Sequence, residues 1–206
     1  MFNIMLLRGE NMIKTTAMLL DELVNYRSPK TKICRMVEQG DLIPIVKGLY
    51  ETDKAVSGYL IAGSIYGPSY LSFEFALSRY GLIPEAVYTF TSATFGKKKK
   101  KSYKNAFGTF TYRDVPDDAF PLDIRIEKEG DYAYWIASPE KALCDTLYAA
   151  RPCHSQKELG QWIFDGLRFD ENEFSKLDHE SIENLADTYH CTNLKLLKNL
   201  IRRNTR

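Results

Sequence analysis

Residues 28–53 read SPKTKICRMVEQGDLIPIVKGLYETD, and they carry the signals of a short helix followed by a tight hairpin. Ser28 is a candidate N-cap, Pro29 suits the first helical position, and Gly40 suits the end of the helix. Two short apolar runs then flank Lys47-Gly48, where a hairpin would turn. This stretch therefore predicts one helix and one hairpin in direct succession.

The predicted helix has an apolar side and a polar side. Its buried stripe is formed by Ile33, Met36 and Val37. The opposite side carries short polar and basic residues, which are Ser28, Lys30, Thr31, Lys32 and Arg35. Such a face is often simply hydrated, but it also suits a helix that lies in the major groove of DNA. A hairpin tip has no packing need for lysine, so Lys47 favours the second interpretation, as a contact to phosphate or to the minor groove.

Residues 12–26 precede this stretch and read MIKTTAMLLDELVNY. Their apolar residues lie mostly on one side of a helix, and these are Met12, Leu19, Leu20, Leu23 and Val24. Helix, turn, helix and hairpin within about 40 residues is the layout of a small winged helix, so residues 12–57 are predicted to form a winged-helix DNA-binding domain. A full winged helix usually has three helices before its hairpin. Residues 12–26 therefore form either one long helix or two pieces that break near Thr15–Thr16.

Charge is distributed unevenly along the 206 residues, although the formal net charge is only +1. Residues 1–113 contain 16 basic and 9 acidic residues, whereas residues 114–191 contain 7 basic and 18 acidic ones. The last 15 residues carry five basic residues and no acidic one. A basic N-terminal region is suited to contact with a polyanion, and an acidic middle region is not.

The remainder of the chain, residues 58–206, predicts an α+β domain with a small, mostly antiparallel sheet and a helical C-terminal half. A turn around Gly67-Pro68 is followed by a helix that runs to about Tyr80. Period-two alternation and turn signals place strands at 87–91, 106–113, 122–128 and 132–137. Helical patterns then follow at 138–150, 155–166, 171–177, 179–189 and 192–204.

Five consecutive lysines occur between the first two of these strands, and they are Lys97, Lys98, Lys99, Lys100 and Lys101. Five adjacent cations cannot all pack, so the run predicts a solvated loop. It is either a flexible hairpin connection that aids solubility or a second set of phosphate contacts, because lysine-rich loops bind nucleic acids without sequence preference.

Motifs for catalysis and for metal binding are weak. Ser138-Pro139-Glu140-Lys141 matches the S-x-x-K pattern of serine acylases, but Ser138 and Pro139 also suit a helix N-terminus. The pairs Cys153-His154 and His190-Cys191 match no compact zinc module. The chain has no GxxxxGK[ST], GxGxxG or HExxH motif. We therefore expect no enzymatic activity, no metal and no cofactor.

The cysteines indicate a reducing compartment. Cys34, Cys144, Cys153 and Cys191 form no CxxC pair, and the sequence shows no secretory signal. No stretch approaches the roughly 20 apolar residues that a membrane span needs. A cytoplasmic location without membrane contact is therefore predicted. Residues 1–11 are expected to be a non-native or disordered extension, because codons for Arg8-Gly9-Glu10 can form a bacterial ribosome-binding site before Met12.

Several strings together resemble the AbiEi antitoxin family of bacterial abortive-infection, type IV toxin–antitoxin systems. The resemblance covers roughly residues 14–150, and the strings are KTKICRMVEQGDLIPIVKGLYET, YGPSYLSFEFALSRYGLIPE, YTFTSATF, GTFTYRDV and IASPEKALCDTLY. It implies a winged helix that binds inverted repeats in the chain's own promoter, and a second domain that counteracts a nucleotidyltransferase-type toxin, with or without direct contact.

By position, the resemblance places the DNA contacts at Lys30, Thr31, Lys32, Arg35 and Lys47. The residues that carry the resemblance elsewhere are interpreted as structural, and they are Gly67, Pro68, Ser69, Tyr70, Ser138, Pro139, Glu140 and Lys141. A reduced winged helix buries less surface, so a homodimer on double-stranded DNA is a candidate state.

The main hypothesis is that the chain is a DNA-binding antitoxin that also represses transcription of its own type IV toxin–antitoxin operon, a system of phage defence. The alternative is a protein-interaction module, in which the acidic middle region binds a basic partner such as the toxin and the winged helix serves as a scaffold.

Overall fold

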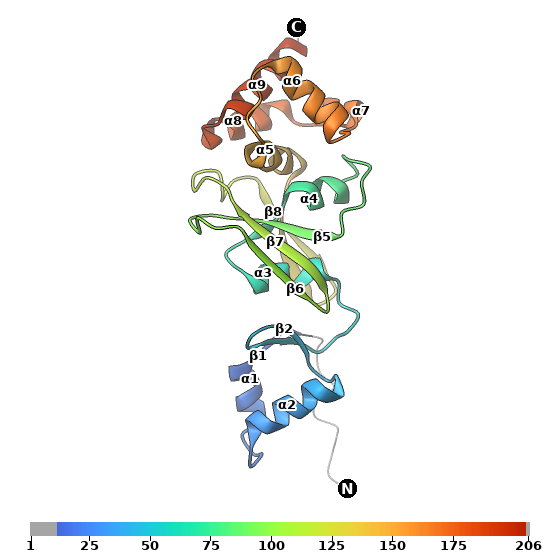
Figure 1. The fold of residues 1–206 in the computed structure, drawn as a ribbon, viewed down its shortest axis with the longest axis vertical. Helices are drawn as coiled ribbons and strands as arrows, with labels where there is room; N and C mark the ends of the chain where they lie inside the picture. Colours follow the sequence, from blue (N-terminus) through green and yellow to red (C-terminus); the bar gives the residue numbers. More distant parts are fainter. Residues whose placement is uncertain (1–11, 205–206) are drawn as a thin grey trace.

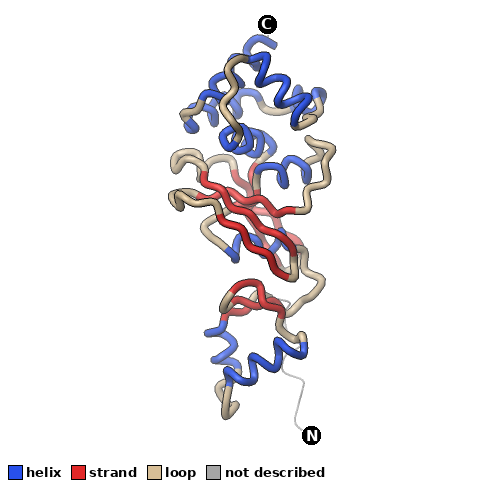
Figure 2. Tube along the Cα trace, in the orientation of Figure 1, coloured by secondary structure: helices blue, strands red, loops and turns tan. Residues whose placement is uncertain are grey.

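The computed structural model describes residues 12–204 and shows an α+β chain with two separate sheets, one of three strands and one of six (Figures 1 and 2). Residues 1–11, on which the predicted extension falls, lie outside the described residues. The smaller sheet and two helices form the N-terminal unit, and the larger sheet with the remaining helices forms the rest of the molecule (Figure 1).

The N-terminal unit has the order strand, helix, helix, hairpin. Its elements are β1 (Lys14–Thr15), α1 (Thr16–Glu22), α2 (Pro29–Gln39), β2 (Ile43–Val46) and β3 (Leu49–Glu51). The three strands are antiparallel in the order β1-β3-β2.

The prediction of one long helix over residues 12–26 is wrong, and the alternative prediction of a break near Thr15–Thr16 is confirmed. Residues 14 and 15 pair with β3, and the Thr15 hydroxyl accepts a hydrogen bond from the Met18 N–H at 3.2 Å, which starts α1 at Thr16. Threonine is a good N-cap, so it begins a helix more readily than it continues one. Because α1 ends at Glu22, Val24 falls outside the apolar stripe and is 69% exposed. Met12 is also exposed, contrary to the prediction.

The bounds of α2 agree with the punctuation in the sequence. Pro29 is its first residue, and Gly40 follows its last with φ of +75°, a conformation that favours glycine. Ile33 and Met36 are buried and Val37 is half-buried, as the stripe predicts. Ser28 precedes the helix, but its side chain makes no capping hydrogen bond.

The three-stranded sheet is packed on both faces. On one face, Tyr50 contacts the small core that α1 and α2 share, which consists of Leu19, Leu23, Ile33, Met36 and Leu42. On the other face, Ile45 is buried in the main hydrophobic core of the molecule. The Asn105 side-chain amide also donates a hydrogen bond to the Ile45 carbonyl at 3.0 Å. The sheet is therefore held between the helix pair and the second domain.

The second domain contains a mixed sheet with the strand order β6-β7-β5-β4-β9-β8. Its elements up to the sheet's last strand are α3 (Gly58–Ile65), β4 (Tyr70–Leu71), α4 (Phe73–Arg79), β5 (Thr89–Thr94), β6 (Lys101–Asn105), β7 (Gly108–Asp114), β8 (Ile124–Glu129) and β9 (Tyr132–Ala137). The pairs β5–β7 and β4–β9 are parallel, and the other three pairs are antiparallel.

The expected small, mostly antiparallel sheet is therefore corrected to a six-stranded mixed sheet. Two strands have no counterpart among the predicted ones, and these are β4, which has only two residues, and β6, which is rich in lysine. The lysine run also needs correction, because Lys101 is the first residue of β6 and not part of a loop. The run does not connect a hairpin either, since β5 and β6 lie on opposite sides of β7.

The C-terminal half is helical, as predicted, and covers one end of the sheet (Figure 1). It consists of α5 (Pro139–Ala149), α6 (Gln156–Gln161), the π-helical turn Trp162–Gly166, α7 (Glu171–Lys176), α8 (His179–Tyr189) and α9 (Thr192–Asn204). Among residues 12–204, none of the helices has the length and apolar character to cross a membrane.

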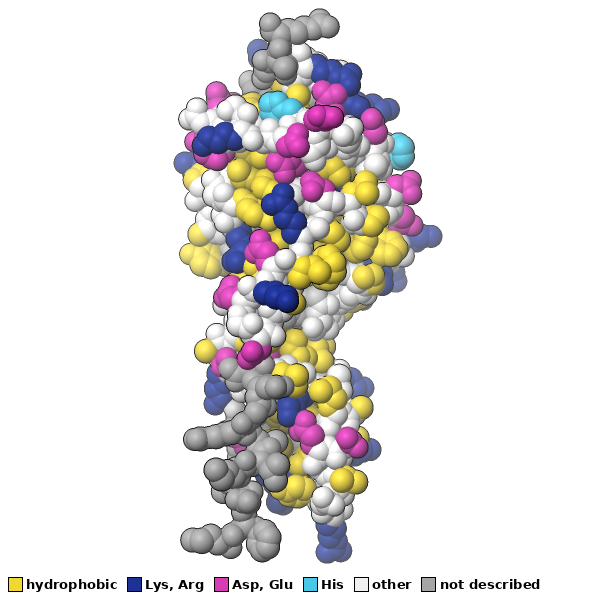
Figure 3. All heavy atoms as spheres, turned by 180° about the vertical axis from the view of Figure 1, so that it is seen from behind, with side chains coloured by type: hydrophobic (Ala, Val, Ile, Leu, Met, Phe, Trp, Pro, Cys, Tyr) yellow, Lys and Arg dark blue, Asp and Glu magenta, His cyan; other side chains and the backbone are white. Residues whose placement is uncertain are grey.

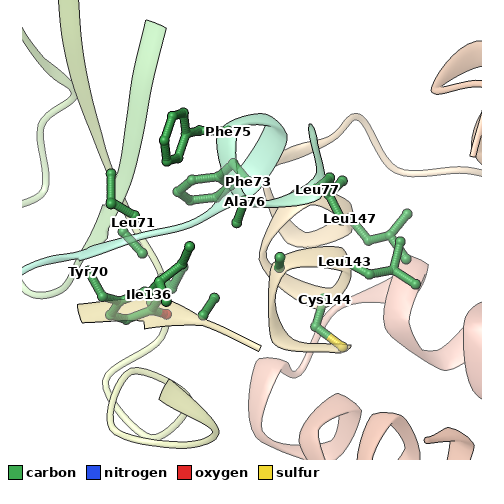
Figure 4. Close-up of a cluster of buried hydrophobic side chains, with 14 of the residues drawn as sticks. Tyr70, Leu71, Phe73, Phe75, Ala76, Leu77, Ile136, Leu143, Cys144 and Leu147 are labelled. Atoms are coloured by element: carbon green, nitrogen blue, oxygen red, sulfur yellow. The ribbon is translucent and has the colours of Figure 1, made fainter. Parts of the chain in front are cut away.

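Aromatic and aliphatic side chains from β4, α4, β9 and α5 meet in the main core, where Phe73, Leu77, Ile136 and Leu143 lie close together (Figure 4). Within this core, Lys141 and Asp145 of α5 have no exposed surface and lie 3.5 Å apart. Asp145 accepts hydrogen bonds from Tyr70 at 3.0 Å and from Ser72 at 2.6 Å. It also accepts one from Tyr189 at 2.5 Å.

The Lys141 ammonium group donates to the Ala119 carbonyl at 2.5 Å and to the Tyr189 hydroxyl at 2.7 Å. Burial raises the pKa of Asp145 and lowers the pKa of Lys141, because desolvation penalises both charged forms. The hydrogen bonds satisfy the charges and connect β4, α5 and α8 through one buried network.

Asp145→Ala should lower the free energy of unfolding by about 3–5 kcal/mol, because it leaves the Lys141 charge buried without its partner. Urea denaturation followed by circular dichroism measures this change. Asp118→Ala, at an exposed acid, is the control and should change stability by less than about 0.5 kcal/mol. A loss below about 1 kcal/mol for Asp145→Ala would contradict the role of this network.

Candidate nucleic-acid interface

The outer face of α2, defined as Ser28, Lys30, Thr31, Lys32 and Arg35, lies opposite its buried stripe. All of these residues are exposed except Lys32, which is half-buried. The Lys32 ammonium group lies 5.9 Å from the centre of the Tyr26 ring, a position that orients the lysine without neutralising it. In Figure 1, α1 and α2 lie on one side of the three-stranded sheet and the second domain lies on the other. The second domain therefore does not cover α2.

The cations of this face have no acidic partners. Within residues 12–204, Lys30, Lys32 and Arg35 form no ion pair, and the same holds for Lys47. Lys14, by contrast, is paired with Glu22 at 2.8 Å on the adjacent α1. Unpaired cations on a helix are available to phosphate groups without first breaking a salt bridge.

Lys47 occupies the tip of the β2–β3 hairpin, and its side chain is exposed. Gly48 next to it has φ of +83°, which suits the tight turn. The Gly48 carbonyl accepts a hydrogen bond from the Thr16 N–H at 2.9 Å, so the tip lies beside the first residue of α1. Lys47 therefore lies at the end of the sheet beside α1, with its side chain exposed to solvent.

The net charge of the N-terminal unit is small. Residues 12–57 contain seven basic and six acidic residues. Two of the acids are already engaged, because Glu22 pairs with Lys14 and Glu51 is fully buried. The capacity to bind a polyanion therefore depends on where the unpaired cations lie and not on the overall charge.

The lysine run belongs to a different part of the molecule. It lies beside Asp114 at the end of β7, and the Lys98 N–H donates a hydrogen bond to that carboxylate at 2.5 Å. The N-terminal unit contacts the opposite end of the β6–β7 hairpin, at Asn105. Because β6 is five residues long, about 13 Å of strand separates Lys101 from Asn105. The run is thus not continuous with the outer face of α2.

Lys97 differs from its neighbours in being half-buried, with its ammonium group 5.4 Å from the centre of the Tyr66 ring. Lys98, Lys99, Lys100 and Lys101 are exposed. Lys104, which is not among the predicted contacts, is exposed one residue before Asn105, near the hairpin that carries Lys47. Recognising Lys104 would have required predicting β6.

The S-x-x-K pattern has a geometry that differs from that of an acylase. The Ser138 hydroxyl accepts a hydrogen bond from the Lys141 N–H at 3.0 Å, as a helix N-cap does, and donates to Asp123. The Lys141 ammonium group instead donates to Ala119 and Tyr189. In the described part of the chain, no three His, Cys, Asp or Glu side chains gather as a metal site would require.

No known family model matches the chain, and a comparison with curated proteins finds no match.

Arg35→Ala and Lys47→Ala should each change the free energy of unfolding by less than about 0.5 kcal/mol, because neither side chain contributes to packing or to an ion pair. Ile33→Ala, on the buried side of the same helix, should cost about 2–5 kcal/mol. Urea denaturation of the three variants tests this separation. A clear loss of stability in Arg35→Ala would show that the outer face of α2 is part of the structural framework.

Proposed function

We propose that this chain is a DNA-binding autorepressor and antitoxin of the AbiEi type, which counteracts a nucleotidyltransferase-type toxin. One observation carries the DNA-binding part of the proposal: the cations on the outer face of α2 are unpaired, and the face is turned away from the second domain. The resemblance of residues 14–150 to that family supports the antitoxin part.

The N-terminal unit is interpreted as a reduced winged helix. Its order of strand, helix, helix and hairpin, with β1 beside β3, agrees with a winged helix that lacks its first helix. The second domain covers the face of the sheet on which Ile45 lies and so supplies packing that the small unit lacks. In this interpretation α2 is the recognition helix and the β2–β3 hairpin is the wing.

The chemistry of each side chain determines which contact with DNA it would make. Lys30 and Thr31, in the first turn of α2, would contact phosphates or base edges at the entry of the helix into the major groove. Arg35, one turn further along, has the planar donor fork that reads guanine. Lys47 at the wing would add a phosphate contact beside the same groove. The lysine run would contribute only if the duplex followed the long axis of the molecule.

Replacing both Lys32 and Arg35 by alanine should weaken binding to the duplex upstream of the chain's own reading frame by a few kcal/mol, at about 1–3 kcal/mol for each good base contact. Gel-shift titration at fixed salt measures the loss. Lys157→Ala removes an exposed lysine from α6 and is the matched control, which should bind as the original chain does.

If Lys30 neutralises one phosphate, Lys30→Ala should in addition make the dependence on salt less steep. The negative slope of the logarithm of the DNA-binding constant against the logarithm of salt concentration should shrink in magnitude by about 0.9. The doubly substituted chain should still rescue cells from the toxin, because the antitoxin activity is assigned to the second domain. Unchanged DNA binding in the double variant would refute the placement of the interface, and lost rescue in a stably folded double variant would refute the separation of the two activities.

A further inference from the structure

Strand β8 ends the six-stranded sheet and pairs with β9 on one side only. Just beyond the last β8–β9 pair, the Ser138 N–H donates to the Asp123 carbonyl at 3.0 Å, which marks Asp123 and Ser138 as a hydrogen-bonded position. Since hydrogen bonding alternates along an antiparallel pair, the N–H and C=O groups of Ile124, Ile126 and Lys128 are directed away from β9. The sheet thus has an open edge that can accept another strand.

An apolar surface lies directly beside this edge. Ile126 on β8 is opposite Trp135 on β9, and these side chains are 54% and 47% exposed. Leu122, just before the strand, is 39% exposed. Hydrophobic side chains gather over the middle of the molecule in the view from behind (Figure 3). An exposed tryptophan next to an open strand edge is typical of an interface, where aromatic residues are enriched.

The charges of β8 identify the strand that fits this edge. A second copy can add to it only in antiparallel orientation about a twofold axis, which brings side chains of the same face together. With the axis at Ile126, Arg125 of each copy is opposite Glu127 of the other, and Lys128 is opposite Ile124. With the axis at Arg125 or Glu127, two like charges meet at the centre. Of these three registers, only the one centred on Ile126 pairs opposite charges without a like-charge pair at its centre.

We propose that β8 is a homodimerisation edge, at which two copies of this chain join their six-stranded sheets with Ile126 on the twofold axis. The centre of the interface is a row formed by Trp135 and Ile126 of each copy, one strand apart. The alkyl part of Lys128 covers Ile124 of the other copy. Asp123 does not oppose Glu129 within the sheet, because with φ of +50° it lies outside the strand. This dimer does not depend on the proposed DNA binding.

Cysteine cross-linking in the full chain tests the register. In a Cys34→Ser background, which removes the exposed native thiol, Ile126→Cys should form a covalent dimer under mild oxidation. Directly opposed residues in antiparallel strands have Cα atoms about 5.5 Å apart, which suits a disulfide. Ile124→Cys is the matched control and should form no covalent dimer, because its two thiols would lie about 13 Å apart along the strand. Equal cross-linking of both variants, or of neither, would overturn the proposal.

Sedimentation of the unmodified chain at increasing concentration provides an independent readout. We expect dimers, and Ile126→Lys should abolish them because it places two ammonium groups on the axis. Tyr88→Lys, at an exposed aromatic position away from β8, should leave them intact. Because Ile126 is half-exposed, the variant should keep the circular dichroism spectrum of the original chain. A chain that stays monomeric at all concentrations, or a dimer that survives Ile126→Lys, would overturn the proposal.

Discussion

The position of the small sheet between two hydrophobic clusters is the constraint on which the functional account depends. Tyr50 on one face packs against the core of α1 and α2, and Ile45 on the other face is buried in the main core. The Asn105 amide fixes the same strand by a hydrogen bond to the Ile45 carbonyl. Because the second domain occupies one face of the sheet, the helices must lie on the other, and the polar side of α2 must face outward. A loosely tethered unit would present its cations in many orientations, whereas this packing presents them in one.

The second domain shows how residues with chemically suggestive side chains can be structural. Lys141 belongs to an S-x-x-K pattern in the sequence, but it and Asp145 are fully buried and satisfied by Tyr70, Ser72 and Tyr189. Their side-chain partners come from β4 with the residue after it and from α8, which are distant from α5 in the chain, so the network fixes the relative positions of β4, α5 and α8. Such a network costs desolvation but specifies one arrangement, since any other would leave a charge without a partner. We infer that the IASPEKAL segment serves the architecture of this domain.

Much of the fold can be predicted from local signals, and the failures have physical causes. Pro29 and Gly40 define α2, and the patterns of the C-terminal half give the bounds of α8 and α9, because caps and helical periodicity depend on nearby residues. The sheet was harder to predict, since a two-residue strand such as β4 has no periodicity and is formed only by its neighbours. The lysine-rich β6 shows no alternation of apolar residues, and its place beside β7 results from long-range pairing. For the candidate site, the sequence indicates which cations share a helix face, but not which of them lack partners.

The interface on α2 can be tested by nuclear magnetic resonance of the isotope-labelled chain, titrated with the duplex upstream of its own reading frame. We expect the backbone amide signals of residues 28–35 and of Lys47-Gly48 to shift first and together, and those of the buried network around Lys141 to stay unchanged. Shifts confined to the lysine run at 97–101 or to the C-terminal helices, with α2 unaffected, would contradict this interface.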